Sequence, residues 1–399
     1  MRLAAISTRQ WTGSAYAAAD SWSLAMDFPS TGDGTSPTLF LESITREGED
    51  TTAGGSAVTL PAVSFTGVDL PNRLNPGNFP ALDRYRIADV TTETGSVIEV
   101  SYTQAGPCSV SSPPAPSSNT SSCFPVYWQQ FQPPTPDWFI RYAVSSVDQT
   151  DPAGGSPGIY TSYKYAGPAW HYDDNEVVEP KFRAYGQFRG YRDVKTFTGT
   201  GSDAQTESEA TYYQGMSDDN DSAAVSLTDS QGGSHPDLNQ LAGDPLETTQ
   251  DDFSGGAVED SQIYSYWVPA AAATRTRPGL PALTASFTGQ VEQWTRTAIT
   301  DSSPATWRKT ETDTSYDTGT ADAGFGLPLF VFAHGDLSQS SQETCTSTTY
   351  AAANTSKNLA GLPAEAEVDA AACGGPDPGG SSAPTAGETN ALTAPPGLS

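Results

Sequence analysis

Residues 170–176 form the densest group of side chains in the sequence that could do chemistry. They are Trp170, His171, Tyr172, Asp173, Asp174, Asn175 and Glu176. Neighbouring carboxylates beside aromatic rings are the groups that glycoside hydrolases use, one as the acid and one as the nucleophile or base. The same carboxylates could supply the oxygen ligands that Ca²⁺ requires. Adjacent Asp side chains on a strand point in different directions, so we favour a solvated turn after a strand with buried aromatic residues.

A second acidic run, residues 218–221, places three carboxylates within four positions. It lacks the glycine at loop position six and the glutamate at position twelve of an EF-hand, so it predicts at most loose Ca²⁺ binding. Nucleophilic catalysis has less support, because the only histidines are His171, His235 and His334, and we identify no nucleophile with its base. We therefore expect no catalytic residues, no enzymatic activity, no cofactor and no metal site.

The four cysteines form two local pairs. Cys108 and Cys123 are 15 positions apart, and Cys345 and Cys373 are 28 apart. Neither pair has the spacing of a zinc site, and no histidine lies near either pair in the sequence. Two disulfide bonds and four free thiols both remain open. Of the two possible bonds, Cys108–Cys123 is the better supported, because the Pro/Ser-rich segment between these cysteines is a loop that needs closure.

Composition excludes several classes of protein. The 399 residues include 47 acidic and 19 basic side chains, for a formal net charge of -28. Such a charge repels phosphate backbones, so we expect no nucleic-acid partner. No apolar run approaches the 18 residues of a membrane-spanning helix. Aromatic residues make up 10% of the chain, which supplies enough apolar area to argue against full disorder.

The elements that must position these side chains are predicted to be strands. β-branched and aromatic residues dominate short runs that Gly, Pro, Asp and Ser separate. The predicted strands are residues 3–11, 85–92, 96–102, 138–147, 160–165, 188–198, 207–213, 262–268, 286–299 and 307–316. The turn at residues 93–95 joins the second and third strands as a hairpin. We therefore predict an all-β fold of many short antiparallel strands and hairpins.

Three other segments differ in composition. Residues 216–253 are acidic and hold few large apolar side chains, so we predict a long loop excursion with one short helix near residues 238–241. Residues 359–372 are rich in alanine, but Pro363 interrupts any helix there. Residues 374–399 are a low-complexity tail, which leaves residues 1–373 as one β segment. The N-terminus has no signal-peptide pattern and begins in a predicted strand, so we expect a fragment of a longer protein.

Several motifs, taken in order, resemble the Rhs/YD-repeat proteins of polymorphic toxin systems. The most telling is residues 187–196 (QFRGYRDVKT), which include Arg189, Gly190 and Tyr191. Tyr316 and Asp317 form a YD-like dipeptide, and no regular repeat array follows them. The remaining motifs are residues 85–95, 98–102, 123–128, 137–144, 165–174, 212–216, 315–319, 334–337 and 345–350. The resemblance lies upstream of, or among, the first YD repeats of that family.

The resemblance implies a fold and a role. In that family, strand–turn–strand units wind into a hollow β-shell that encloses a C-terminal toxin. This chain would then be a non-enzymatic segment of the Rhs/YD β-shell wall, secreted or at the cell surface. Its partners would be the rest of the shell and the toxin cargo. No toxin domain and no processing region are recognisable in the sequence.

A carbohydrate-binding or adhesin-like β module remains the main alternative. Four tryptophans could stack on sugars of cell-surface glycans. They are Trp128, Trp138, Trp170 and Trp267. Burial in a core explains the same residues, and a glycosidase that uses Asp173, Asp174 and Glu176 is a third and weaker hypothesis.

Overall fold

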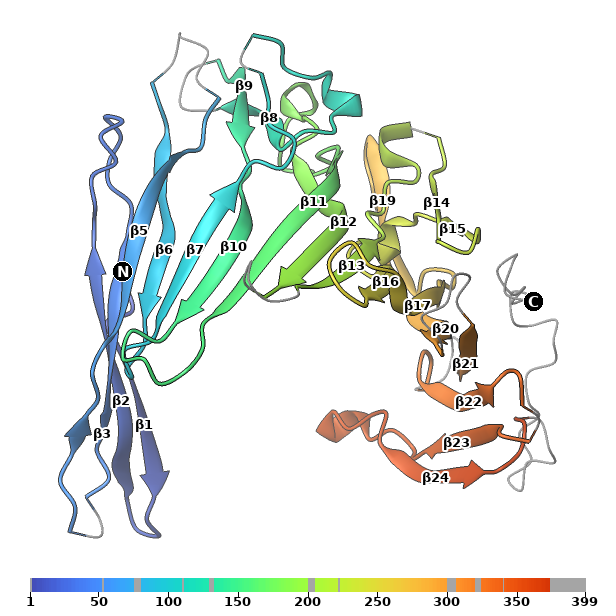
Figure 1. The fold of residues 1–399 in the computed structure, drawn as a ribbon. Helices are drawn as coiled ribbons and strands as arrows, with labels where there is room; N and C mark the ends of the chain where they lie inside the picture. The colour runs from blue at the N-terminus through green and yellow to red at the C-terminus, as the bar shows by residue number, and fades with distance from the viewer. Residues whose placement is uncertain are drawn as a thin grey trace. The chain divides into compact units, whose positions relative to one another are not determined.

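The computed structural model describes residues 2–51, 54–74, 80–109, 111–128, 133–199, 205–221, 223–299, 306–319, 324–339 and 341–373. Within these ranges the chain is nearly all β, with five short 3-10 turns (Figure 1). The predicted all-β, antiparallel fold class is confirmed. The chain divides into two compact units, of which the first is Met1–Lys164 with Thr196–Gln205 and the second is Tyr165–Lys195 with Thr206–Ser399.

The first unit is an antiparallel meander. The pairing order is β1, β2, β3, β5, β6, β7, β10 and β11, and the short β4 also pairs with β3. Strands β8 and β9 form a separate hairpin. The elements are β1 Ala5–Trp11, β2 Tyr16–Asp27, β3 Phe40–Gly48, β4 Val58–Thr59, β5 Val63–Pro71, β6 Asp83–Thr91, β7 Val97–Thr103, η1 Pro116–Ser118, β8 Cys123–Trp128, β9 Thr135–Ile140, β10 Ala143–Thr150 and β11 Ile159–His171.

The second unit continues with the same architecture. Strands β13, β16, β17, β20, β21, β22, β23 and β24 pair antiparallel in that order. Strand pairs β14–β15 and β18–β19 form small separate sheets. The elements are η2 Pro180–Phe182, β12 Gln187–Thr198, β13 Thr206–Tyr212, η3 Asp219–Asp221, β14 Ser226–Thr228, β15 Ser234–Pro236, η4 Asn239–Leu241, β16 Pro245–Asp251, β17 Val258–Trp267, β18 Ala273–Arg277, β19 Leu280–Ala285, β20 Gly289–Ala298, β21 Trp307–Tyr316, β22 Pro328–Asp336, β23 Thr344–Tyr350, η5 Thr355–Lys357 and β24 Pro363–Asp369.

Strand periodicity explains which side chains are buried. In β17 and β20, Ile263 pairs directly with Trp294, and both are buried on one face of the sheet. Ser261 and Glu292 lie two positions away on the same strands and are buried on the same face. The two-residue repeat therefore creates a sheet face on which apolar and acidic side chains are buried together.

Most of the buried hydrophobic residues in the described ranges fall into three small clusters. One gathers Tyr213, Leu227, Leu241 and Leu246. A second gathers Leu74, Cys123 and Ile140, and the third is the Ile263–Trp294 pair. A compact domain usually has one contiguous core. The described part of this chain instead has thin, local cores beneath long sheets.

Three segments differ from the predicted elements. Residues 138–147 are two strands, because β9 pairs with β8 whereas β10 pairs with β7. The acidic segment 216–253 contains β14, β15 and β16, and β16 belongs to the main meander. The alanine-rich segment ends in β24, whose pairing with β23 outweighs the helix propensity of alanine. The tail at residues 374–399 lies outside the described residues.

No helix in the described ranges has the length and apolar character needed to cross a membrane.

Candidate metal centre

The cluster at residues 170–176 begins on the last two residues of β11. Trp170 is buried and packs on Phe188, with ring centroids 4.9 Å apart. His171 Nε2 lies 3.3 Å from a carboxylate oxygen of Asp219, and its Nδ1 lies 2.7 Å from the Tyr172 carbonyl oxygen. The Tyr172 ring contacts Tyr185. The aromatic part of the cluster is therefore a packed strand end.

The carboxylates of this cluster form ion pairs. Arg277 donates a hydrogen bond to Asp174 at 2.5 Å, and Arg275 donates one to Glu176 at 2.5 Å. These hydrogen bonds lower the pKa of both carboxyl groups. Asp173 accepts a hydrogen bond from the backbone N–H of Asn175. A glycosidase acid requires a raised pKa, so this arrangement suits ion pairing and turn formation, and it does not suit acid catalysis.

The three family-motif residues of β12 have packing contacts. The Tyr191 ring lies 4.6 Å from that of Tyr165 and 5.3 Å from that of Phe188. Gly190 has a φ of +89°, and its carbonyl accepts a hydrogen bond from Gln214 at 2.8 Å. Burial lowers the pKa of Arg189. These contacts tie β12 to its neighbours in the sheet.

The YD-like dipeptide lies at the end of β21. The Tyr316 ring stacks on Trp267 with 5.4 Å between centroids and 6° between planes, and its hydroxyl donates to the Gln290 carbonyl. Asp317 accepts a hydrogen bond from the N–H of Gly319. Tyr316 therefore joins β21 to β17 and β20, while Asp317 shapes the turn that follows.

Disulfide bonds join Cys108 to Cys123 and Cys345 to Cys373, with Cα–Cα distances of 6.0 and 5.0 Å. The sequence left two disulfides and four free thiols open, and the structure has two local disulfides. Cys123 is fully buried in the cluster with Leu74 and Ile140, so the first bond closes the Pro/Ser-rich loop onto a hydrophobic cluster. The second bond connects β23 to the residues that follow β24.

None of the four tryptophans considered for sugar stacking is exposed. Trp170 is buried, and the other three are half-buried: Trp128, Trp138 and Trp267. Arg73 covers the ring of Trp128, and Tyr316 covers that of Trp267. A sugar platform requires an open ring face, so these contacts favour packing roles.

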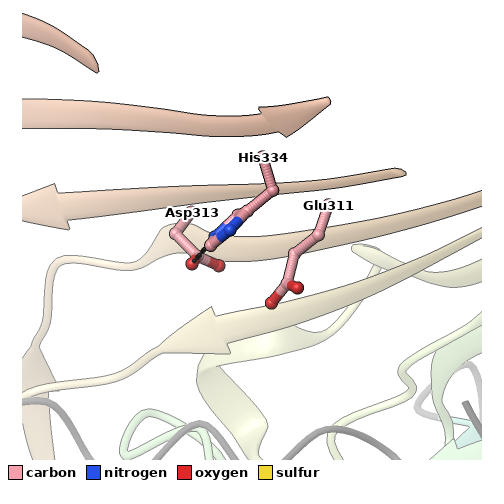
Figure 2. Close-up of side chains that lie close together, drawn as sticks. All are labelled: Glu311, Asp313 and His334. Carbon is pink, nitrogen blue, oxygen red and sulfur yellow. Dashed lines mark hydrogen bonds and ion pairs between the residues drawn. The ribbon is translucent and has the colours of Figure 1, made fainter. Parts of the chain in front are cut away.

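The structure assembles a different polar cluster, on β21 and β22. Ligand-capable atoms of Glu311, Asp313 and His334 all lie within 4.8 Å of one another (Figure 2). Glu311 and Asp313 are two positions apart on β21, so both side chains lie on one face of the sheet. His334 Nε2 lies 2.8 Å from Asp313 Oδ2.

A β-bulge positions the histidine. Thr312 pairs with Ala333 and Glu311 pairs with Gly335, so His334 is the extra residue on β22. Gly335 has a φ of +67°, the left-handed conformation that a bulge of this kind takes up with glycine. A Cβ at this position would also lie 2.7 Å from the Gln342 side chain. The bulge therefore depends on Gly335, and bulges commonly aim a side chain at a site.

A third carboxylate, from a fourth residue, belongs to this cluster. Glu292 on β20 pairs in register with Asp313, and its side chain hydrogen-bonds Glu311. Only 3% of Glu292 is exposed to solvent. Burial, together with the charges of Asp313 and Glu292, raises the pKa of Glu311 from its ordinary 4.5 to about 8. A proton on Glu311 thus offsets part of the negative charge.

The sequence contained only a weak signal for this cluster. The alternation of Glu311 and Asp313 within a predicted strand places both on one face. Nothing in the sequence showed that β20 and β22 flank this strand in the register that adds Glu292 and His334. Among the described residues, no contact joins the cluster at residues 170–176 to the cluster on β20, β21 and β22.

Comparisons with known proteins gave few matches. No family model matches the chain, and no curated protein matches it. Among solved structures, the chain is similar to a crystal structure of TcdB2-TccC3-TEV, with 12% identity and a TM-score of 0.42 over 87% of this chain and 19% of that one. It is also similar to a Photorhabdus luminescens Tc holotoxin pore that carries a TccC3 mutation, with 13% identity and a TM-score of 0.44 over 86% of this chain and 19% of that one. The chain spans about a fifth of the length of these proteins.

Proposed function

We propose that this chain is a non-enzymatic structural segment of a Rhs/YD-type shell, secreted or at the cell surface. In this proposal the chain forms part of the shell wall. Its sheets pair with the rest of a larger assembly, and that assembly encloses a toxin cargo. The ordered sequence motifs support the family, and the antiparallel meanders support a wall. The ion-paired acids of residues 174 and 176 agree with a structural role.

The observation that carries the proposal is the exposure of the two outermost strands. Every residue of β1 and every residue of β24 is solvent-exposed. Among the described residues, β1 pairs with β2 alone and β24 pairs with β23 alone. An exposed edge of seven residues presents unpaired N–H and C=O groups, which invite pairing with another strand. Thin cores fit the same role, because a wall gains stability from its neighbours.

Sedimentation velocity of the purified chain tests the proposal. We expect association that grows with protein concentration, because the open edges pair between molecules. A compact monomer that stays monomeric at high concentration contradicts a wall segment. The disulfides must be kept oxidised in this experiment, so that unfolded chains do not contribute.

A glycan array separates this function from a carbohydrate-binding module. A wall segment gives no saturable binding to any glycan. Saturable binding that quenches tryptophan fluorescence would contradict the structural role and favour the binding module. An array read-out does not depend on association, so the two experiments can fail independently.

A further inference from the structure

One sheet face shared by β20, β21 and β22 gathers three carboxylates against one imidazole, whose Nε2 lies 2.8 Å from Asp313 Oδ2. It holds the carboxylates of Glu292, Glu311 and Asp313 and the imidazole of His334. Burial of like charges is unfavourable unless a proton or a cation neutralises them.

Two buried carboxylate oxygens of the cluster lack a hydrogen-bond partner, which indicates a missing cation. Glu292 Oε1 and Asp313 Oδ1 are both buried, and neither accepts a hydrogen bond from any N–H or hydroxyl group of the described residues. A buried acceptor without a partner destabilises the fold. Glu292 is more than nine-tenths buried and lies against Glu311 and Asp313, so its carboxylate is directed into the cluster.

The spacing of the donors fits one small cation. Two ligands that each lie about 2.0–2.2 Å from one Zn²⁺ are at most about 4.4 Å apart. The ligand atoms of Glu311, Asp313 and His334 lie within 4.8 Å of one another, so a small side-chain rotation brings them to one ion. Both flanking strands pair with β21, β20 in unbroken register and β22 across the bulge at His334, which holds the ligands in place.

The donor types select the class of metal. Ca²⁺ and Mg²⁺ take oxygen ligands, whereas an imidazole beside carboxylates suits Zn²⁺ and the other divalent first-row transition metals. We propose that Glu292, Glu311, Asp313 and His334 bind one divalent transition-metal cation of the Zn²⁺ class. The ion crosslinks three neighbouring strands and is the partner that the oxygens Glu292 Oε1 and Asp313 Oδ1 lack.

Calorimetric titration of the chelator-stripped full chain with ZnCl₂ tests this site. We expect saturable binding of one ion per chain and a higher melting temperature in the presence of Zn²⁺. The variant His334→Gln weakens the Zn²⁺ affinity at least 100-fold. The matched control His235→Gln removes another His–Asp pair, in which Nε2 lies 2.7 Å from Asp229, and keeps wild-type affinity.

A second variant distinguishes loss of the metal site from loss of the fold. Glu292→Gln keeps the size of the side chain and removes a charge from the cluster, so we expect at least tenfold weaker binding with an unchanged circular dichroism spectrum. Absence of saturable Zn²⁺ binding, equal affinity in wild type and His334→Gln, or Ca²⁺ binding in place of Zn²⁺ would each overturn the proposal. Visible absorption of the Co²⁺-loaded protein reports the coordination geometry of the bound ion, and a changed spectrum in His334→Gln supports the assignment.

Discussion

At the scale of single residues, buried carboxylates organise the loops of the second unit. Asp237 is fully buried, and its side chain accepts hydrogen bonds from the backbone N–H groups of Gln214, Gly215 and Met216 at 2.8, 2.7 and 3.0 Å. These three donors lie directly after β13. One side chain therefore shapes the turn that carries the chain away from the sheet.

Replacement of Asp237 should destabilise this unit. In Asp237→Ala three backbone donors lose their acceptor, so we expect the free energy of unfolding to fall by about 3 kcal/mol. Urea unfolding followed by tryptophan fluorescence measures the loss. The control is Asp252→Ala, an exposed acid for which we expect a change within about 0.5 kcal/mol. Equal stability of the two variants would contradict the role of Asp237.

Asp229 gives a prediction about pH. Burial alone would raise its pKa, but hydrogen bonds from His235 and from the N–H groups of Gly233 and Gln231 outweigh burial, and the pKa lies below its ordinary 3.8. A carboxyl group with a lowered folded-state pKa stabilises the fold above its unfolded-state pKa. That stability is lost as the pH falls through the folded-state pKa.

The variant Asp229→Asn should therefore be less stable than wild type by about 2 kcal/mol at pH 6, because the charged hydrogen bonds are weakened. The difference should shrink as the pH falls from 6 to 2.5, since wild type loses the same contribution by protonation. Urea midpoints measured across this pH range check the trend. A difference that stays constant with pH would show that the charge of Asp229 is not what stabilises the fold.

At the scale of elements, one arginine connects the β18–β19 hairpin to the segment after β11. Arg277 is 5% exposed and donates to the Pro281 carbonyl, the Asp174 carbonyl and the Asp174 carboxylate. The neighbouring pair between Arg275 and Glu176 is exposed. Removal of the buried Arg277 should therefore lower the stability of the fold strongly, whereas removal of the exposed Arg275 should change it little.

The variant Arg277→Ala should release this hairpin. We expect its opening free energy to fall by about 3 kcal/mol, because a buried network loses its donor. Hydrogen exchange of the β18 and β19 amides should then be about 100-fold faster. Arg275→Ala is the matched control and should change exchange by less than about fivefold. Similar exchange in the two variants would mean that backbone pairing alone holds the hairpin.

At the scale of the whole molecule, the exposed strands decide how the chain behaves in solution. Ile6 on β1 is 47% exposed and Val368 on β24 is 66% exposed. Natural sheets protect such edges with charged side chains, lysine above all. Neither strand contains a lysine, although β1 carries Arg9 and β24 carries Glu365, Glu367 and Asp369. The exposed apolar side chains of Ile6 and Val368 are therefore what these edges offer to further strands.

The double variant Ile6→Lys/Val368→Lys should reduce association. We expect the weight-average sedimentation coefficient to fall towards that of a monomer, because a charge on each edge opposes strand pairing. The control Val177→Lys changes an 88% exposed residue outside any strand and should sediment as wild type does. If both proteins associate equally, the contacts lie elsewhere than at the two edges.

Much of the secondary structure could be predicted from the sequence, because β-branched and aromatic runs favour strands wherever they occur. Residues 286–299 and 307–316 were predicted as strands and form β20 and β21. Residues 363–369 could not be predicted in this way. Their alanines and glutamates have little strand propensity, and pairing with β23 alone makes them β24.

By itself the sequence determined the all-β class, the strongly negative charge and a cysteine spacing compatible with two local disulfides. These properties depend on residue types and short separations. Only the tertiary structure decided which strands are neighbours and in what register they pair. The physical reason is that a hydrogen-bonded ladder joins residues far apart in the chain, and so Glu292, Asp313 and His334 meet only once β20, β21 and β22 are aligned.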